Sequence, residues 1–156
     1  MSMHKIGVIS DTHGLLRDEV VSAFNNVDMI IHAGDIGSSD IIEKLNIKAP
    51  VVAVRGNNDK GELAKRYPKT EIVEIGGKFI YILHDINELD LDPKGSGFNV
   101  VISGHSHKPS LEEKDGILYL NPGSAGPIRF RLPVSIAYLE IYENSVEAKV
   151  VELAVK

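Results

Sequence analysis

The chain contains no cysteine. This absence excludes cysteine nucleophiles, disulfide scaffolds, iron–sulfur clusters and cysteine-ligated zinc, so any metal site must rely mainly on nitrogen and oxygen ligands. Long apolar segments are absent as well, because none approaches the roughly 18 residues of a membrane span. We therefore expect no membrane partner.

Positive charge is scarce, since 17 lysine and arginine residues face 22 aspartate and glutamate residues and leave a net charge of −5. Proteins that bind nucleic acid by bulk charge carry a basic excess, so strong nucleic-acid binding is not expected.

The 156 residues match one domain of about 100 to 200 residues, and no linker or repeat interrupts them. We predict a single domain over residues 1–156. No signal peptide precedes the first apolar segment, which favours a cytoplasmic protein.

Five short apolar segments predict buried strands. Each is apolar almost continuously, which is typical of strands covered on both faces in a mostly parallel α/β sheet. Helical patterns separate the first three segments, the second of them capped by Ser39 or Asp40, and a third helix over residues 60–67 is predicted to end before Pro68. The apolar segments are residues 6–9, 29–31, 51–54, 79–83 and 100–102.

The second half of the chain predicts antiparallel hairpins. Gly76-Gly77 and Asp115-Gly116 are turn signals, each between two segments with strand character. A last hairpin is expected between residues 134–142 and 146–155, where apolar and charged side chains alternate near the end. We therefore expect two sheets packed face to face with helices outside.

Polar side chains follow all five apolar strands at the point where each strand ends. In α/β sheets the binding crevice lies beyond the carboxyl ends of the strands, so residues far apart in the sequence can converge there. All of these side chains offer the nitrogen or oxygen atoms that divalent metals bind. In chain order they are Asp11, His13, Asp35, Asn57, His84, His105 and His107.

Each motif alone also has an ordinary structural interpretation. Asp11 or Thr12 could cap a helix, and residues 56–59 have the composition of a turn. His105 and His107 are harder to explain as turn residues, because two histidines separated by one residue after an apolar strand suit a metal site better. The joint occurrence of all the motifs favours a metal site.

The order Asp-x-His, Gly-Asp, Gly-Asn-x-Asp, His and Gly-His-x-His resembles the calcineurin-like metallophosphoesterase superfamily. The segment Asn121-Pro122-Gly123-Ser124 is similar to its small YfcE-type phosphodiesterase branch. The resemblance covers nearly the whole chain and implies a four-layer αββα sandwich of two mixed sheets with two metal ions at the strand ends. By matching position it implies a first ion held by Asp11, His13, Asp35 and His107, and a second held by Asp35, Asn57, His84 and His105.

The function that the resemblance implies is the metal-dependent hydrolysis of small phosphodiesters by a hydroxide held between two divalent ions. Mn²⁺ is the first choice, with Ni²⁺, Co²⁺, Fe or Zn²⁺ as alternatives. Asp35, which would bridge the ions, Asn57 and His105 are expected to carry the catalysis. The alternative is a protein-binding scaffold of the same fold, like the retromer subunit. Dimerisation of two copies of this chain through an exposed strand edge is a further alternative.

Two departures from the family pattern bear on mechanism. Asn58 stands where many larger members have a histidine that protonates the leaving group, which predicts a preference for activated diesters. Asp85 follows His84 where the small branch often has glycine, and it either orients an imidazole or caps the following loop. Asp59 is expected beside the ligands or as a helix cap, and Arg129 at a substrate phosphate or in solvent. The loop over residues 87–97 is either a flap or a plain connection.

Overall fold

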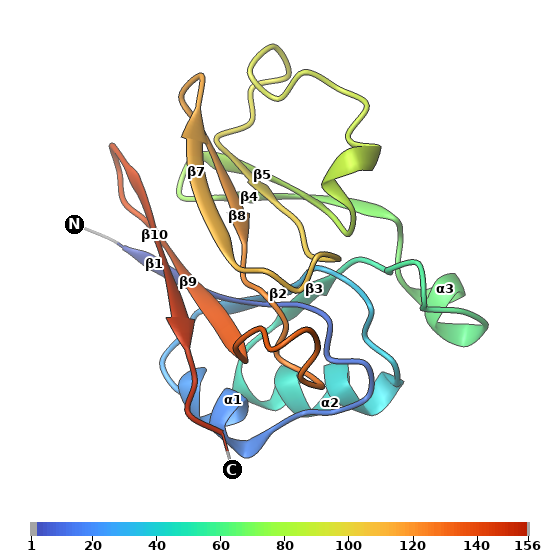
Figure 1. The fold of residues 1–156 in the computed structure, drawn as a ribbon. Coiled ribbons are helices and arrows are strands. Elements are labelled where there is room, and N and C mark those ends of the chain that lie inside the picture. The colour runs from blue at the N-terminus through green and yellow to red at the C-terminus, as the bar shows by residue number, and fades with distance from the viewer. Residues whose placement is uncertain (1–2, 156) are drawn as a thin grey trace.

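A computed structural model describes residues 3–155 of the chain. Two five-stranded sheets pack face to face (Figure 1). In the first sheet the three strands from the N-terminal half are parallel, and the two C-terminal strands join them antiparallel. Its strands, in spatial order, are β10 (Val146–Glu152), β9 (Ser135–Ile141), β1 (His4–Ile9), β2 (Met29–His32) and β3 (Val51–Ala53).

The second sheet is also mixed. Its three central strands are parallel, and each edge strand pairs antiparallel through a short hairpin. Both hairpins predicted from Gly76-Gly77 and Asp115-Gly116 are confirmed. Its strands, in spatial order, are β4 (Thr70–Ile75), β5 (Lys78–Leu83), β6 (Val100–Ile102), β8 (Ile117–Asn121) and β7 (Ser110–Lys114).

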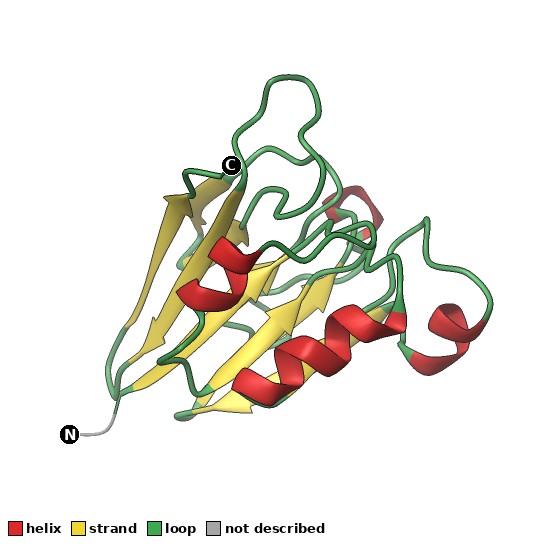
Figure 2. Ribbon diagram, turned by 90° about the horizontal axis from the view of Figure 1, so that it is seen from below, coloured by secondary structure: helices red, strands yellow, loops and turns green. Residues whose placement is uncertain are grey.

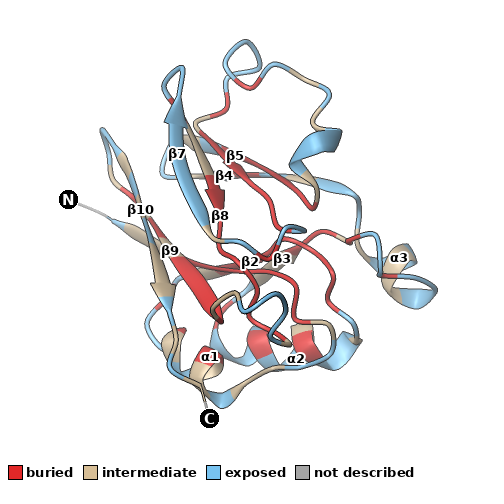
Figure 3. Ribbon diagram, viewed as in Figure 1, coloured by how far each residue is buried: buried red, intermediate tan, exposed pale blue. Residues whose placement is uncertain are grey.

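The main core lies between the two sheets. Alternate residues of β1, Ile6 and Val8, point into it and meet Ile80 and Ile82 of β5 within one cluster of fully buried side chains. Ile9 belongs to a second cluster on the other face of the first sheet. Both faces of this sheet are therefore covered, which explains why its parallel strands are apolar without alternation (Figure 3).

Helices α1 (Asp18–Ala23) and α2 (Ser39–Lys48) cover the outer face of the first sheet (Figure 2). Ile41 and Leu45, one turn apart on α2, are buried against that sheet. The short helix α3 (Glu62–Arg66) lies at the side of the fold beyond β3, ahead of Pro68 as the sequence predicts (Figure 1). No helix within the described residues is long and apolar enough to cross a membrane.

The outer layer of the second sheet differs from the expected helical layer. It consists of residues 84–99, an irregular segment with one 3-10 turn, η1 (Ile86–Glu88). Leu89, Leu91 and Phe98 of this segment pack with Tyr81 of β5. Pro93 and two nearby glycines disfavour a helix here, so the covering layer is a loop. The predicted fold class, an α/β sandwich of two mixed sheets, is confirmed.

Candidate metal centre

The candidate ligands lie in the loops that follow the parallel strands of both sheets. Backbone hydrogen bonds join the loop after β1 to the loop after β2, from Asp11 N to Gly34 O at 2.9 Å and from His13 N to Asp35 O at 2.9 Å. The loop after β6 is joined to the loop after β5 by a bond from Gly104 N to His84 O at 2.9 Å. A further bond, from His84 Nδ1 to Ala33 O at 2.7 Å, joins the loops of the two sheets at one end of the sandwich.

Five of the seven candidate ligands adopt a backbone conformation that residues other than glycine seldom use. A positive φ is uncommon outside glycine and costs about 1 kcal/mol or more per residue, and such residues gather at functional sites. These residues are Asp11 (φ 56°), His13 (46°), Asp35 (57°), His105 (74°) and His107 (64°). All of them except His105 turn their side chains toward one another.

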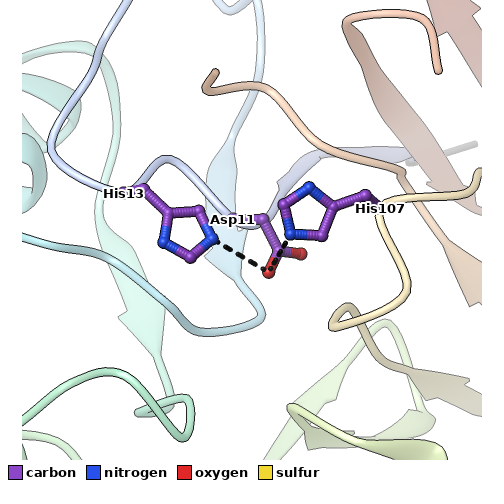
Figure 4. A group of neighbouring side chains, drawn as sticks. All are labelled: Asp11, His13 and His107. Atoms are coloured by element: carbon purple, nitrogen blue, oxygen red, sulfur yellow. Dashed lines mark ion pairs between the residues drawn. The ribbon is translucent and has the colours of Figure 1, made fainter. Parts of the chain in front are cut away.

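Asp11, His13 and His107 form the first group of close ligand atoms (Figure 4). The Oδ1 atom of Asp11 lies 3.7 Å from His13 Nε2 and 3.6 Å from His107 Nε2. The two imidazole rings stack with their centroids 5.3 Å apart. One carboxylate oxygen and two imidazole nitrogens thus face a common point.

Asp11, Asp35 and His84 form the second group. His84 Nε2 lies 3.2 Å from Asp35 Oδ2 and 3.8 Å from Asp11 Oδ1. The other ring nitrogen, Nδ1, donates to the carbonyl oxygen of Ala33 at 2.7 Å, so Nε2 is left to accept from a donor or bind a cation. Asp35 Oδ2 is also 3.6 Å from His13 Nε2, which places Asp35 between the two groups.

Three buried atoms at this point have no hydrogen-bond partner among the described residues: Asp11 Oδ1, His13 Nε2 and His84 Nε2. Leaving a buried polar atom unpaired costs about 1 to 3 kcal/mol, so three together need an explanation. Atoms bound at about 2.1 Å to one tetrahedral ion would lie about 3.4 Å apart, close to the separations seen here. The donor set, oxygen and imidazole nitrogen, fits divalent cations.

Electrostatics favour the charged carboxylates. Burial raises the pKa of Asp11, but the neighbouring His13 and His84 outweigh it and hold this pKa below its ordinary value. Burial also raises the pKa of Asp35, yet His84 and two donors of Asn58 hold it far below the usual range. Burial lowers the pKa of His84, and the two carboxylates more than reverse this and raise it. Both carboxylates are therefore ionised at neutral pH, as cation binding requires.

Each carboxylate is oriented by further hydrogen bonds. Asp11 Oδ2 accepts from Ser10 Oγ at 2.7 Å and from the His105 backbone N–H at 3.1 Å, which leaves Oδ1 free to point at the site. Asn58 donates to both oxygens of Asp35, from its backbone N at 2.9 Å and from Nδ2 at 3.0 Å. The sequence did not single out Ser10, because a serine before the motif carries no signal of its own.

Asp59 ties two loops of the site together. Its buried carboxylate accepts backbone N–H groups of Ile36 at 3.0 Å, Gly37 at 3.0 Å and Gly56 at 2.9 Å. The loop after β2 is therefore anchored to the loop after β3. Gly56 must be glycine in this arrangement, because a Cβ atom there would lie 2.1 Å from Asp35 Oδ1.

His105 belongs to neither close group within the described part of the chain. Asn57 is exposed, and the His105 side chain is 43% exposed, with its ring edge-on to His84 at 5.2 Å. His105 Nε2 lies 3.7 Å from Asp85 Oδ2. Asp85 caps η1 by accepting from Asn87 N at 3.0 Å, which is one of the two roles that the sequence left open.

Two further residues adjoin the histidines. Asn121, at the end of β8, donates from Nδ2 to Gly104 O at 2.9 Å and to Ser106 Oγ at 3.2 Å, which fastens the loop that carries His105. It follows the same strand-end rule as the ligands, and that rule could have found it. Burial lowers the pKa of His107, and the charge of Arg129 lowers it further, which places this exposed arginine within electrostatic reach of the site.

The comparisons with known proteins agree with this geometry. The family model for the calcineurin-like phosphoesterase superfamily domain matches residues 4–144. A probable metallophosphoesterase of Methanocaldococcus jannaschii is 41% identical over 162 aligned positions, which cover 95% of this chain and 81% of that protein. A phosphodiesterase of the same organism is 35% identical and covers 76% of this chain and 82% of its own length.

Among solved structures, Vacuolar Protein Sorting 29 from Cryptosporidium parvum superposes with a TM-score of 0.83 over 97% of this chain and 92% of that one. At 22% identity this likeness concerns the fold alone. The family match and the 41% identical relative both extend over nearly all of the sequence that builds the site. The chain therefore belongs to the calcineurin-like phosphoesterase superfamily.

Proposed function

We propose that this protein is a metal-dependent phosphodiesterase that hydrolyses small phosphodiesters with two divalent ions at the strand ends. The observation that carries the proposal is the convergence of Asp11 Oδ1, His13 Nε2 and His84 Nε2 beside Asp35, all three buried and without a hydrogen-bond partner in residues 3–155. The 35% identical phosphodiesterase of M. jannaschii supports the choice of a diester.

The first ion would be held by Asp11, His13, Asp35 and His107. The second would be held by Asp35 and His84 on its buried side, with Asn57 and His105 completing the exposed side. When bound, the ions would supply Lewis-acid charge to the phosphate oxygens and lower the pKa of a water molecule between them. We propose Mn²⁺ as the preferred ion, with Ni²⁺, Co²⁺, Fe or Zn²⁺ as alternatives that the same donor types accept.

The protein's own residues position the ligands and the substrate, and we assign none of them to protonating the leaving group. The side-chain amide of Asn58 is engaged with Asp35 Oδ2 and is a poor acid, so it cannot protonate a leaving alcohol. Arg129 is the cation we assign to the substrate phosphate, because its charge acts on His107 and arginine pairs bidentately with phosphate oxygens. We therefore propose that diesters with good leaving groups react fastest.

The test is the initial rate of bis-p-nitrophenyl phosphate hydrolysis by chelator-stripped protein, with and without added Mn²⁺. We expect activity only with the metal, and at least about 100-fold less activity in Asp35→Asn, since this carboxylate lies between both groups. Asp115→Asn is the matched control, because Asp115 has a similar φ of 53° in an exposed turn far from the ligands. Metal-independent hydrolysis, or full activity of Asp35→Asn, would contradict the proposal.

A protein-binding scaffold is the second candidate. Ile128 is 59% exposed and Phe130 86% exposed in the loop before β9, and exposed apolar groups of this size often mark interaction surfaces. Absence of hydrolysis with every divalent ion tested would make this candidate the leading one.

A further inference from the structure

A cavity of about 780 Å³ adjoins the metal centre on the side of Asn57, His84 and His105. We propose that this cavity, which we call the ester pocket, binds one organic group of the substrate and selects uncharged aromatic groups over anionic ones. The inference rests on the proposed function, because it assigns a substrate class to the same site. The ester pocket extends from these three residues along β5 to Thr70 and Lys69 on one side and Glu88 and Asp90 on the other.

Part of the lining of the ester pocket is apolar. Tyr81 and Leu83, which are 6% and 3% exposed, line it from the outer face of β5, and the next residue along the chain is the candidate ligand His84. Phe98 packs against Tyr81 with the ring centroids 5.1 Å apart, which holds the Tyr81 ring in place. Aromatic groups bind well to such rigid aromatic and aliphatic surfaces. A flat organic group bound here would extend from a phosphate at the ligands onto this apolar part of the lining.

The size of the ester pocket suits a substantial group. Cavities of roughly 300 to 1,000 Å³ are typical of small-molecule sites, and about 780 Å³ is more than one phenyl ring requires. A phosphodiester carries two organic groups and a single negative charge. One of these organic groups can occupy the ester pocket while the phosphate lies at the ligands.

The charges at the rim oppose an anionic group. Asp85, Glu88 and Asp90 line one side, and Arg55 and Lys69 are the cations among the lining residues. Since like charges repel most strongly where water is partly displaced, an added negative charge on the ester group would be repelled by these carboxylates.

Arg55 keeps its positive charge, and one nitrogen of its guanidinium, Nη1, also fixes the edge of the pocket. It donates to the backbone carbonyl oxygens of Ala64 at 2.7 Å and Tyr67 at 3.2 Å, which fastens α3 to the loop after β3. The three carboxylates of the lining still outnumber its two cations, Arg55 and Lys69. The balance of charge favours an uncharged organic group.

The test uses two anions of equal charge that contain no ester bond, diphenylphosphinate and dimethylphosphinate, titrated calorimetrically into the Mn²⁺-loaded protein. We expect the diphenyl compound to bind at least about tenfold more tightly. Thr70→Trp places a large ring at an exposed strand position on the rim and should remove this preference while leaving dimethylphosphinate unchanged. Glu74→Trp is the control, since Glu74 is exposed on the same strand but does not line the pocket.

A second binding experiment tests the selection against anionic groups. Bis(4-carboxyphenyl)phosphinate should bind at least about tenfold more weakly than diphenylphosphinate, and the double variant Glu88→Gln, Asp90→Asn should recover most of that loss. Equal affinities for the diphenyl and dimethyl compounds, or a preference that survives in Thr70→Trp, would overturn the inference. If the aryl preference is present but no diester is hydrolysed with any divalent ion, the phosphodiesterase proposal fails while the ester pocket stands.

Discussion

His32 makes the stability of this protein sensitive to mild acid. The ring is fully buried under the site, where Nδ1 accepts from Gly34 N at 3.1 Å and Nε2 donates to Thr12 Oγ1 at 3.0 Å. The Thr12 hydroxyl in turn donates to Ile36 O at 2.8 Å, so the network suits a neutral imidazole. Burial lowers the pKa of His32 to about 4, against a partial opposing effect of nearby carboxylates such as Asp11.

The expected loss of stability follows from the two pKa values. The unfolded chain titrates this histidine near its ordinary pKa of 6.5, whereas the folded protein keeps it neutral down to about pH 4. Below pH 6.5 the unfolded state therefore binds a proton that the folded state does not, and the free energy of unfolding falls as pH falls. A single group with these two pKa values removes about 2 kcal/mol of stability between pH 7 and pH 5.

Urea unfolding of the chelator-stripped protein at pH 7, 6 and 5 measures this loss. His32→Asn is the informative variant, because its side-chain carbonyl can accept from Gly34 N but cannot be protonated. The raised pKa of His84 makes the free energy of unfolding change with pH in the opposite direction. His84 is present in both wild type and His32→Asn, so its contribution cancels when the pH dependences of these two proteins are compared. His4→Asn, at the partly exposed start of β1, is the control and should behave as wild type. Equal pH dependence in wild type and His32→Asn would refute the reasoning.

Four further predictions concern the site. Asp59→Asn replaces one acceptor by a donor facing a backbone N–H and should lower the free energy of unfolding by about 2 to 3 kcal/mol in urea titrations. Gly104→Ala puts a Cβ 2.0 Å from Ser10 Oγ and should weaken Mn²⁺ binding in calorimetry; Gly95→Ala, beside a flexible side chain, should not. Asn58→His should raise the rate with phenyl esters relative to p-nitrophenyl esters, and an unchanged ratio would remove the argument about the missing acid. Saturating Mn²⁺ at about 100 times its dissociation constant should stabilise wild type by about 2.7 kcal/mol for each ion bound, and Asp35→Asn by less.

Much of the fold could be predicted from local pattern. The continuous apolar segments mark the parallel strands because burial on both faces leaves no polar alternation. The hairpins around Gly76-Gly77 and Asp115-Gly116 follow from turn chemistry that acts over a few residues. The outer layer of the second sheet was not predicted correctly, because residues 84–99 cover it through scattered apolar contacts of Leu89, Leu91 and Phe98 that show no helical period.

The sequence by itself determined which residue types end the strands, and through them the family and the ligand chemistry. Only the tertiary structure decided how those side chains meet. It shows Asp11 in both groups of ligand atoms with Asp35 between them, and it adds Ser10 as a hydrogen-bond donor to Asp11. Local sequence cannot contain this information, because the contacts join loops from two sheets and depend on side-chain directions set by positive φ angles. The ester pocket arises in the same way, from β4, β5 and the η1 segment brought together by packing.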